Sequence, residues 1–167
     1  MATRAETGTA EVVRGYFDAL AEQDLDRATA HWAPGGVDNL HGMAELRAPD
    51  GIREFFSELF AAFPDFRFEV LSLVADGELA AVRWRTRATF TGPGRFQGFS
   101  PNGARVEMEG CDMLTVRDGL IQENHAYTNG ADIARQIGAL PPEGSRQDRA
   151  LTALVNARTR ASRLLRR

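Results

Sequence analysis

Apolar residues recur at helical spacing through the first third of the chain. Residues 10–20 place their apolar side chains on one helical face. A shorter helix is predicted at 24–32, with Asp24 as its cap and a Pro-Gly-Gly sequence just beyond it. The clearest pattern spans 52–63, where large apolar residues fall at i, i+3, i+4, i+7, i+8 and i+11 before Pro64 stops the helix. The pattern therefore predicts three helices in this region.

From Phe66 onward the apolar period changes from helical to alternating, which is typical of strands. The predicted strands are 66–74, 79–90, 104–116 and 120–129. They are separated by Asp-Gly turns and one Gly/Pro-rich loop, so they form an antiparallel meander. A short extended piece at 37–41 precedes them, and a short helix is predicted at 131–137. We therefore expect an α+β fold in which three N-terminal helices pack on a strongly curved antiparallel sheet and enclose a conical pocket.

Pro141 and Pro142 mark a boundary toward the end of the chain. We expect one domain at 1–139 and an Arg-rich helical extension at 140–167. The extension carries the apolar residues Leu151, Leu154, Val155, Leu164 and Leu165. These predict a peripheral helix that packs on the body or on a neighbouring subunit.

The hairpin around Asp118-Gly119 carries the most specific chemical signal. Asp-Gly between two alternating runs is typical of a two-residue type I′ turn. If the two strands pair without interruption, Asp112 lies opposite His125 on the apolar face, with Cβ atoms roughly 5 Å apart. A carboxylate beside an imidazole in a dry pocket is the usual preparation of a general base. The alternative is a structural pair that satisfies itself in the core, and a register slip of one residue would remove the pair altogether.

Other polar and aromatic residues are candidates for lining the pocket. Tyr127 and Asn129 continue along the same face as His125 and offer hydrogen bonds. His41 ends the extended piece at 37–41, where an ordinary polar loop is the alternative. Trp84 lies on the less charged face of its strand and Tyr16 on the first helix, and both could equally be core residues.

Composition excludes several classes of chemistry. The chain has one cysteine and no lysine, which rules out an internal disulfide and a lysine Schiff base. No apolar run is long enough for a membrane span, and the beginning of the chain lacks the pattern of a secretory signal, so we expect a cytoplasmic protein. The sequence contains no metal-binding, Walker or dinucleotide motif, and we predict neither metal nor cofactor.

Charge is divided unevenly along the chain. Residues 140–167 hold seven arginines against two acidic residues, a formal charge of +5, which leaves −8 for residues 1–139. A basic arm of this kind could contact nucleic acid. No aromatic residues are interleaved for base stacking, so solvated arginines on a helix are the favoured interpretation and we predict no nucleic-acid partner.

The order of elements and three segments resemble the SnoaL-like polyketide cyclases of the NTF2-like (nuclear transport factor 2-like) superfamily. The segments are AFPDFRFEV at 62–70, FQGFSPNGARVEMEG at 96–110 and RDGLIQENHAYTNGADIARQIG at 117–138. The resemblance covers roughly residues 10–139 and implies an NTF2-like cone, a small apolar ligand and a homodimer. Two positions depart from the family pattern: Asn129 replaces the acid/base Asp, and Thr89 to Gly92 replaces a Thr-His-x-Gly sequence.

We expect a cofactor-independent enzyme that moves a proton next to a carbonyl of an apolar substrate, leading to cyclisation or isomerisation. In this hypothesis Asp112 orients His125, while Tyr127 and Asn129 hold a carbonyl or enolate oxygen. The alternative, favoured by Asn129, is a noncatalytic module that binds an apolar ligand or presents its sheet to a partner. Epoxide opening is a third possibility. The resemblance implies that this chemistry uses an Asp-Arg-Asp arrangement, and the predicted elements do not place such a set on one face.

Overall fold

The computed structural model describes residues 4–164, and within them the chain forms five helices and one six-stranded sheet. The helices are α1 (Arg4–Ala21), α2 (Leu25–Ala30), α3 (Asp50–Ala62), α4 (Gly130–Gln136) and α5 (Arg146–Leu164). The strands are β1 (Trp32–Leu40), β2 (Ala44–Arg47), β3 (Arg67–Asp76), β4 (Leu79–Thr89), β5 (Arg105–Arg117) and β6 (Leu120–Thr128). The predicted α+β class is confirmed.

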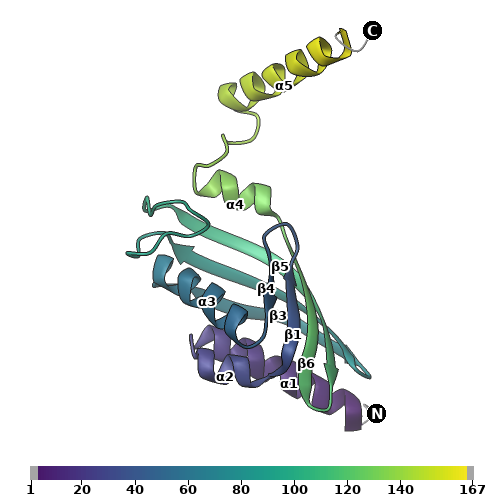
Figure 1. Ribbon diagram of the computed structural model, residues 1–167. Coiled ribbons are helices and arrows are strands. Elements are labelled where there is room, and N and C mark those ends of the chain that lie inside the picture. The colour runs from purple at the N-terminus through teal and green to yellow at the C-terminus, as the bar shows by residue number, and fades with distance from the viewer. Residues whose placement is uncertain (1–3, 165–167) are drawn as a thin grey trace.

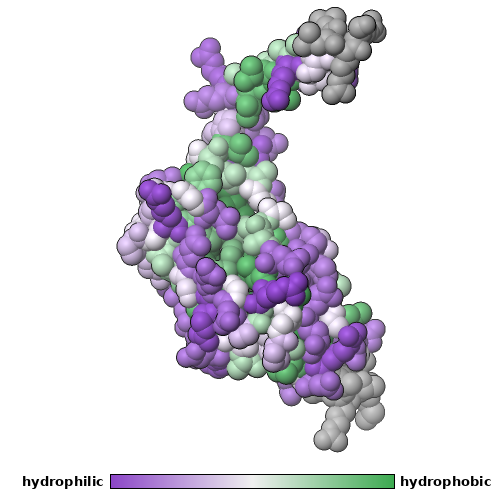
Figure 2. Space-filling model, viewed as in Figure 1, coloured by the Kyte–Doolittle hydropathy of each residue, from purple (hydrophilic) through white to green (hydrophobic). Residues whose placement is uncertain are grey.

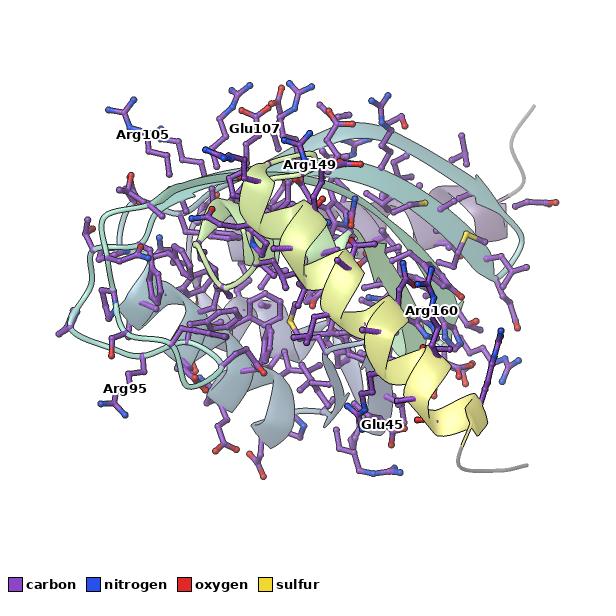
Figure 3. All side chains as sticks on the ribbon, turned by 90° about the horizontal axis from the view of Figure 1, so that it is seen from above. Glu45, Arg95, Arg105, Glu107, Arg149 and Arg160 are labelled. Atoms are coloured by element: carbon purple, nitrogen blue, oxygen red, sulfur yellow. The ribbon has the colours of Figure 1, made fainter. Side chains whose placement is uncertain are left out.

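The strand order in the sheet is β2-β1-β6-β5-β4-β3. Strands β3 to β6 form the predicted antiparallel meander, whereas β1 pairs parallel to β6. Figure 1 shows α1, α2 and α3 gathered on one face of the curved sheet, with α4 over one end. Seen from above in Figure 3, the sheet arches along one side, and the labelled Arg95, Arg105 and Glu107 point away from the interior. The two layers therefore enclose a space between the helices and the inner face of the sheet.

The predicted helical faces form the core. In α1, Val13, Tyr16, Phe17 and Leu20 are each at most 1 % exposed. In α3, the apolar stripe begins at Ile52, which is fully buried, and includes the buried Phe56 and Leu59. These side chains join the inner residues of the sheet in one cluster. Burial of these stripes, rather than helix propensity, is what holds such short helices in place.

The region between α2 and α3 differs from the sequence-based prediction. The second helix ends at Ala30, and Trp32 opens strand β1 instead of closing the helix. The Pro-Gly-Gly sequence lies inside β1, where the pairing with β6 is irregular between Trp32 and Val37. Proline has no N–H group to donate to a neighbouring strand, and glycine weakens strand pairing, so both residues are tolerated at such an irregularity. The segment at 44–47, for which no strand was predicted, forms strand β2 and pairs antiparallel with β1.

The C-terminal helix α5 stands away from the body in Figure 1. Residues 149–163 are all exposed, including Leu151, Leu154 and Val155. A helix was correctly predicted here, but Leu151, Leu154 and Val155 do not pack on the body; the predicted contributions of the Leu164 and Leu165 side chains lie outside what the structure describes. Among the helices of residues 4–164, none is both long and apolar enough to cross a membrane.

The β5–β6 hairpin contains a bulge that changes its register. The turn is as predicted, since Asp118 and Gly119 both have positive φ, and Val116 pairs with Ile121 as expected. Beyond that pair the register shifts between Thr115 and Val116, because β6 contributes one extra residue. From there to the end of the ladder every partner on β6 moves by one position, and each residue of β6 beyond the bulge takes the face opposite to the predicted one.

Candidate active site

A cavity of about 110 Å³ lies between the inner face of the sheet and the helices. One buried water needs roughly 10–15 Å³ by the same measure, so the cavity can admit a small organic molecule. Its wall is largely apolar and rich in aromatic rings, among them Phe17, Phe55, Phe63, Phe68 and Phe96. Figure 2 shows apolar residues gathered in a hollow at the centre of the molecule, with polar residues around it. Among the described residues that line the cavity, none is an arginine.

Asp112 is the carboxyl group most firmly held in this cavity. It is 5 % exposed and accepts two hydrogen bonds, from the indole Nε1 of Trp84 at 2.8 Å and from Nδ2 of Asn124 at 2.8 Å. The same Asn124 nitrogen donates to Oδ1 of Asp38 at 3.0 Å. One amide group is therefore held between two buried carboxyl groups.

Strand register explains how these residues meet. Asp38 on β1 pairs with Asn124 on β6, so their side chains project side by side to the inner face. Asn124 in turn pairs with Leu114 on β5, one inward position away from Asp112. Trp84 lies opposite Gly110 in the β4–β5 pair, also one inward position from Asp112. A Cβ atom at Gly110 would lie 2.3 Å from the indole, so glycine at this position leaves room for the tryptophan.

The two carboxyl groups have raised pKa values. Burial raises the pKa of Asp38 to about 8, and the neighbouring Asp112 adds to the rise while the Asn124 amide opposes it. Burial also raises the pKa of Asp112 to about 6, against hydrogen bonds from Trp84 and Asn124 that stabilise its charged form. Near pH 7 the pair therefore holds about one proton, and the two hydrogen bonds that Asp112 accepts, against one at Asp38, favour Asp112 as the ionised partner. Interacting groups titrate as a pair, so the two values belong to the pair as a whole.

Tyr16 supplies a neutral hydroxyl to the same cavity. It is 1 % exposed and lines the cavity from α1. Burial, followed by the negative charges of Asp38 and Asp112, raises its pKa well above the usual value. The phenol consequently stays protonated at every physiological pH and keeps an O–H that can donate a hydrogen bond.

His125 does not contact Asp112, so the predicted catalytic pair is wrong. The bulge pairs Asp112 with Ala126 and places His125 opposite Met113, on the outer face of the sheet. Tyr127 is 51 % exposed on that outer face for the same reason. A continuous ladder would have brought these side chains inward, and one extra residue in β6 turns them outward.

Asn129 is not among the residues that line the cavity. It is the N-cap of α4, and its side-chain oxygen accepts a hydrogen bond from the backbone nitrogen of Asp132 at 3.2 Å. The sequence-based role for Asn129, holding a substrate oxygen, is therefore not supported by its position. Its capping role explains why a short polar side chain follows the end of β6.

Among the other predicted site residues, Trp84, Tyr16 and His41 do line the cavity. Sequence reasoning missed Asp38 and Asn124. For Asp38 the signal was present, because an acid sits beside apolar residues in the extended piece at 37–41. Asn124 could not be found without the bulge, since an uninterrupted ladder assigns it to the outer face. Within residues 4–164, no group of three or more His, Cys, Asp or Glu side chains is arranged to hold a metal ion.

Comparisons with known proteins agree with this architecture. The family model for SnoaL-like polyketide cyclases matches residues 10–137. No curated protein shows significant similarity to the chain. A SnoaL-like protein from Jannaschia sp. CCS1, proposed to be a polyketide cyclase, has a similar structure with a TM-score of 0.74 and 24 % identity, over 84 % of this chain and 99 % of that one.

Two further structures come from Streptomyces. AclR of Streptomyces galilaeus, a proposed hydroxylase, is similar with a TM-score of 0.71 and 25 % identity, over 94 % of this chain and 98 % of that one. IdmH of Streptomyces antibioticus, a proposed polyketide cyclase, is similar with a TM-score of 0.65 and 27 % identity, over 78 % of this chain and 98 % of that one. With its NTF2-like fold and with most of its length matched by the family model, the chain belongs to the SnoaL-like polyketide cyclase family.

Proposed function

We propose that this protein is a cofactor-independent enzyme in which Asp112 removes a proton next to a carbonyl of an apolar, polyketide-like substrate. Ring closure or isomerisation follows from the resulting enolate. The observation that carries the proposal is a single one: a buried carboxyl group, that of Asp112, is held by Trp84 and Asn124 at the wall of an apolar cavity. Membership of the family and the similarity to IdmH, a proposed polyketide cyclase, support a cyclase or isomerase type of enzyme.

Asp112 suits the role of general base. Its pKa of about 6 keeps it ionised at neutral pH and makes it more basic than an ordinary aspartate. The two hydrogen bonds that it accepts fix its orientation, and an apolar wall gives its charge little competing solvation. A base of this kind contributes typically 10²- to 10⁴-fold to the rate.

Asp38 and Tyr16 suit the opposite role, stabilising the oxygen of the enolate. Both are neutral near pH 7, and both line the cavity with an O–H group. A carboxylic acid kept neutral in an apolar site is an established donor to an enolate oxygen. The cavity therefore contains one base and two neutral donors, which is the set that enolisation requires.

The reaction can be written from these groups. The C–H bond next to the carbonyl breaks, its proton passes to Asp112, and the electron pair moves to the carbonyl oxygen, which receives hydrogen bonds from Asp38 and Tyr16. In a cyclisation the enolate carbon attacks a second carbonyl of the same molecule, a C–C bond forms, and a proton from the site neutralises the new alkoxide. In an isomerisation the proton returns from Asp112 to a different carbon.

Deuterium exchange tests the proposal with simple ketones in place of the natural substrate. In D2O the protein should accelerate replacement of the α-hydrogens in a panel of apolar ketones, from 1-indanone and 1-tetralone to tricyclic ketones, followed by proton NMR. Asp112→Asn should abolish the acceleration, whereas Glu109→Gln, on the outer face of the same strand, should leave it unchanged. Ketones that bind to the wild-type protein and exchange at the uncatalysed rate would indicate a binding module instead.

A further inference from the structure

A row of three polar side chains in contact, Glu123, His125 and His41, runs from the outer face of β6 to the rim of the cavity. Oε1 of Glu123 lies 3.1 Å from Nε2 of His125. Nδ1 of His125 lies 2.9 Å from Nε2 of His41. His41 also lines the cavity, so the row ends at a position that a bound molecule can reach. The bulge that removed His125 from Asp112 is what brings it into this row.

The geometry of the two histidines is that of a true hydrogen bond. Their ring planes differ by 16° and their centroids are 5.2 Å apart. The separation of the ring centres equals the N···N distance plus the distance from each ring centre to its nitrogen. Both nitrogens therefore lie on the line that joins the two ring centres. The contact is therefore an in-plane N–H···N bond rather than a face-to-face stack.

His41 is also fixed by two other contacts. Its ring stacks on Tyr127 with centroids 4.4 Å apart and planes within 12°. Its backbone nitrogen donates to the carbonyl oxygen of Ala126 at 3.0 Å, which continues the parallel β1–β6 ladder by one residue. The imidazole is thus held on the rim even though His41 lies in the turn after β1.

The order of donors in this row follows from its outer end. A carboxylate oxygen lies 3.1 Å from Nε2 of His125, and because a carboxylate has no proton to donate, this contact favours the His125 proton on Nε2. In neutral His125 the other nitrogen, Nδ1, is then an acceptor, and His41 must donate from its own Nε2. Nδ1 of neutral His41 is consequently left as a free base. One exposed carboxylate therefore sets the tautomers of two successive imidazoles.

We propose that His41 is a second acid/base group of this site, placed at the mouth of the cavity, and that His125 and Glu123 are its positioning residues. The proposal rests on the proposed function, because it assigns His41 to the same substrate. Nδ1 of His41 takes a proton from a substrate O–H or C–H bond, the electron pair of that bond stays on the substrate, and the imidazolium keeps its Nε2–H on His125. Glu123 supplies the compensating negative charge at the far end.

The position of His41 also defines the substrate class. His41 lies three residues after Asp38, in the turn just beyond the end of β1, so at most roughly 10 Å of extended chain separates the two residues. Acid/base groups at both places suit an apolar molecule that carries a second carbonyl, enol or phenol oxygen about this far from the carbon attacked by Asp112. A substrate with a single carbonyl would use only the Asp112 end.

Nitrogen-15 NMR of the histidine side chains tests the hydrogen-bond order without any substrate. With both imidazoles neutral, His41 and His125 should each appear as the Nε2–H tautomer. Glu123→Ala should mix the tautomers of His125, and Glu123→Gln should restore a single tautomer because the amide oxygen also accepts. Glu45→Ala, an acidic residue of β2 that is outside the row, serves as the matched control.

Deuterium exchange, with apolar diketones whose second carbonyl lies roughly 10 Å from the exchanging carbon added to the panel of ketones, tests the role of His41. His41→Gln and Glu123→Ala should slow exchange of the diketones about tenfold or more, and Glu123→Gln should restore it. A neutral Nδ1–H tautomer at His125 would overturn the proposal. The proposal would also be overturned if His41→Gln exchanged the diketones at the wild-type rate while Asp112→Asn lost the exchange. If the wild-type protein exchanges no member of the panel, the proposed function fails and the catalytic role of His41 fails with it, while the NMR result still reports the hydrogen-bond order.

Discussion

Strand β5 carries carboxyl groups on both of its faces, and their surroundings are opposite. On the outer face Glu109 accepts hydrogen bonds from Arg83 at 2.7 Å and from Arg85 at 2.6 Å, and these contacts lower its pKa. Three residues further along, Asp112 faces the cavity without a cation, and burial raises its pKa to about 6. The same functional group on the same strand is a solvated ion-pair partner on one side and a base on the other.

The contrast shows which physical factor prepares the inner carboxyl group. Exposed ion pairs such as those of Glu109 contribute little to stability, because water already solvates both partners. At Asp112 water is largely excluded, and neutral donors from Trp84 and Asn124 replace it only in part. Loss of hydration, limited by two hydrogen bonds, is therefore what sets the basicity of Asp112. Each of the following predictions tests one side of this comparison.

The largest expected effect comes from Asp112→Asn. The amide has a similar size but cannot take a proton, so α-hydrogen exchange should fall by about 10²- to 10⁴-fold. Glu109→Gln makes the same chemical change on the outer face and should alter the rate less than about twofold. Rates from proton NMR in D2O provide the measurement, and equal losses in the two variants would remove the distinction between the faces.

The pH dependence of exchange should follow the two inner carboxyl groups. Asp112 must be ionised, so the rate should rise with pH through about 6, and Asp38 must be protonated, so it should fall through about 8. Asp38→Asn leaves a neutral side chain at every pH and should remove the alkaline fall, at a cost of about tenfold in the maximal rate. A wild-type rate that stays constant from pH 7 to 10 would contradict the role given to Asp38.

Asp38→Asn should also stabilise the folded protein at alkaline pH. Because the pKa of Asp38 is higher in the folded chain than its ordinary value near 4, the folded state binds the proton more tightly, and the free energy of unfolding declines as pH rises from about 4 to about 8. Asp38→Asn avoids this decline and should be at least ~1 kcal/mol more stable than wild type at pH 8, with little difference at pH 4. Urea unfolding at the two pH values measures it, and a variant that is less stable at pH 8 would show that Asp38 is stabilised as an anion.

Gly110→Ala tests how the inner face is packed. The added methyl group would lie 2.3 Å from the indole of Trp84, so the ring must move and its hydrogen bond to Asp112 must lengthen. We expect a loss of about 3 kcal/mol in the free energy of unfolding, the upper end for overpacking, together with slower exchange. Thermal and urea unfolding measure the loss. Cys111→Ala, an exposed neighbour on the outer face, is the control and should change stability by less than about 0.5 kcal/mol.

The sequence predicted those parts of the structure that local periodicity encodes. The stripe of α3 from Ile52 to Phe63, the β3–β6 meander and the Asp118-Gly119 turn were all correctly expected, because each depends on neighbours within a few residues. The pairing of β1 with β6 joins segments about 85 residues apart and has no local signal. The bulge in β6 gives only an ambiguous signal, because the four polar residues from Gln122 to His125 interrupt the alternation between Ile121 and Ala126 without showing where the register changes.

In the candidate site too, the sequence predicted the positions that depend on local periodicity and missed those that depend on strand register. Tyr16, Trp84 and Asp112 were placed on inner faces by parity within elements that the sequence predicts well. The partners of Asp112 were wrong because they depend on the β6 register, where one extra residue exchanges Asn124 for His125. Such an error does not affect the predicted fold, because β6 still pairs with β5 in either register and most of the apolar core comes from the helices and the other strands.

The smallest effect is expected from deletion of Gln122. Ile121 and Asn124 both face the interior, which requires the extra residue between them to be taken up as a bulge. Removing Gln122 joins Ile121 to Glu123, and Glu123 already pairs with Thr115, so the ladder becomes regular and every later residue keeps its face. We expect a loss of about 1 kcal/mol in the free energy of unfolding, from the side-chain bonds of Gln122, and exchange activity close to wild type.

Insertion of one alanine between Asn124 and His125 provides the opposite case. It should turn His125 and Tyr127 toward the core and move Ala126 outward, and the folded state should be lost. Circular dichroism and urea unfolding of both variants make the measurement. If β6 had no bulge, deletion of Gln122 would instead reverse the face of every following residue and unfold the protein, so tolerance of this deletion is direct evidence for the register that places Asp112 beside Asn124 and His125 beside His41.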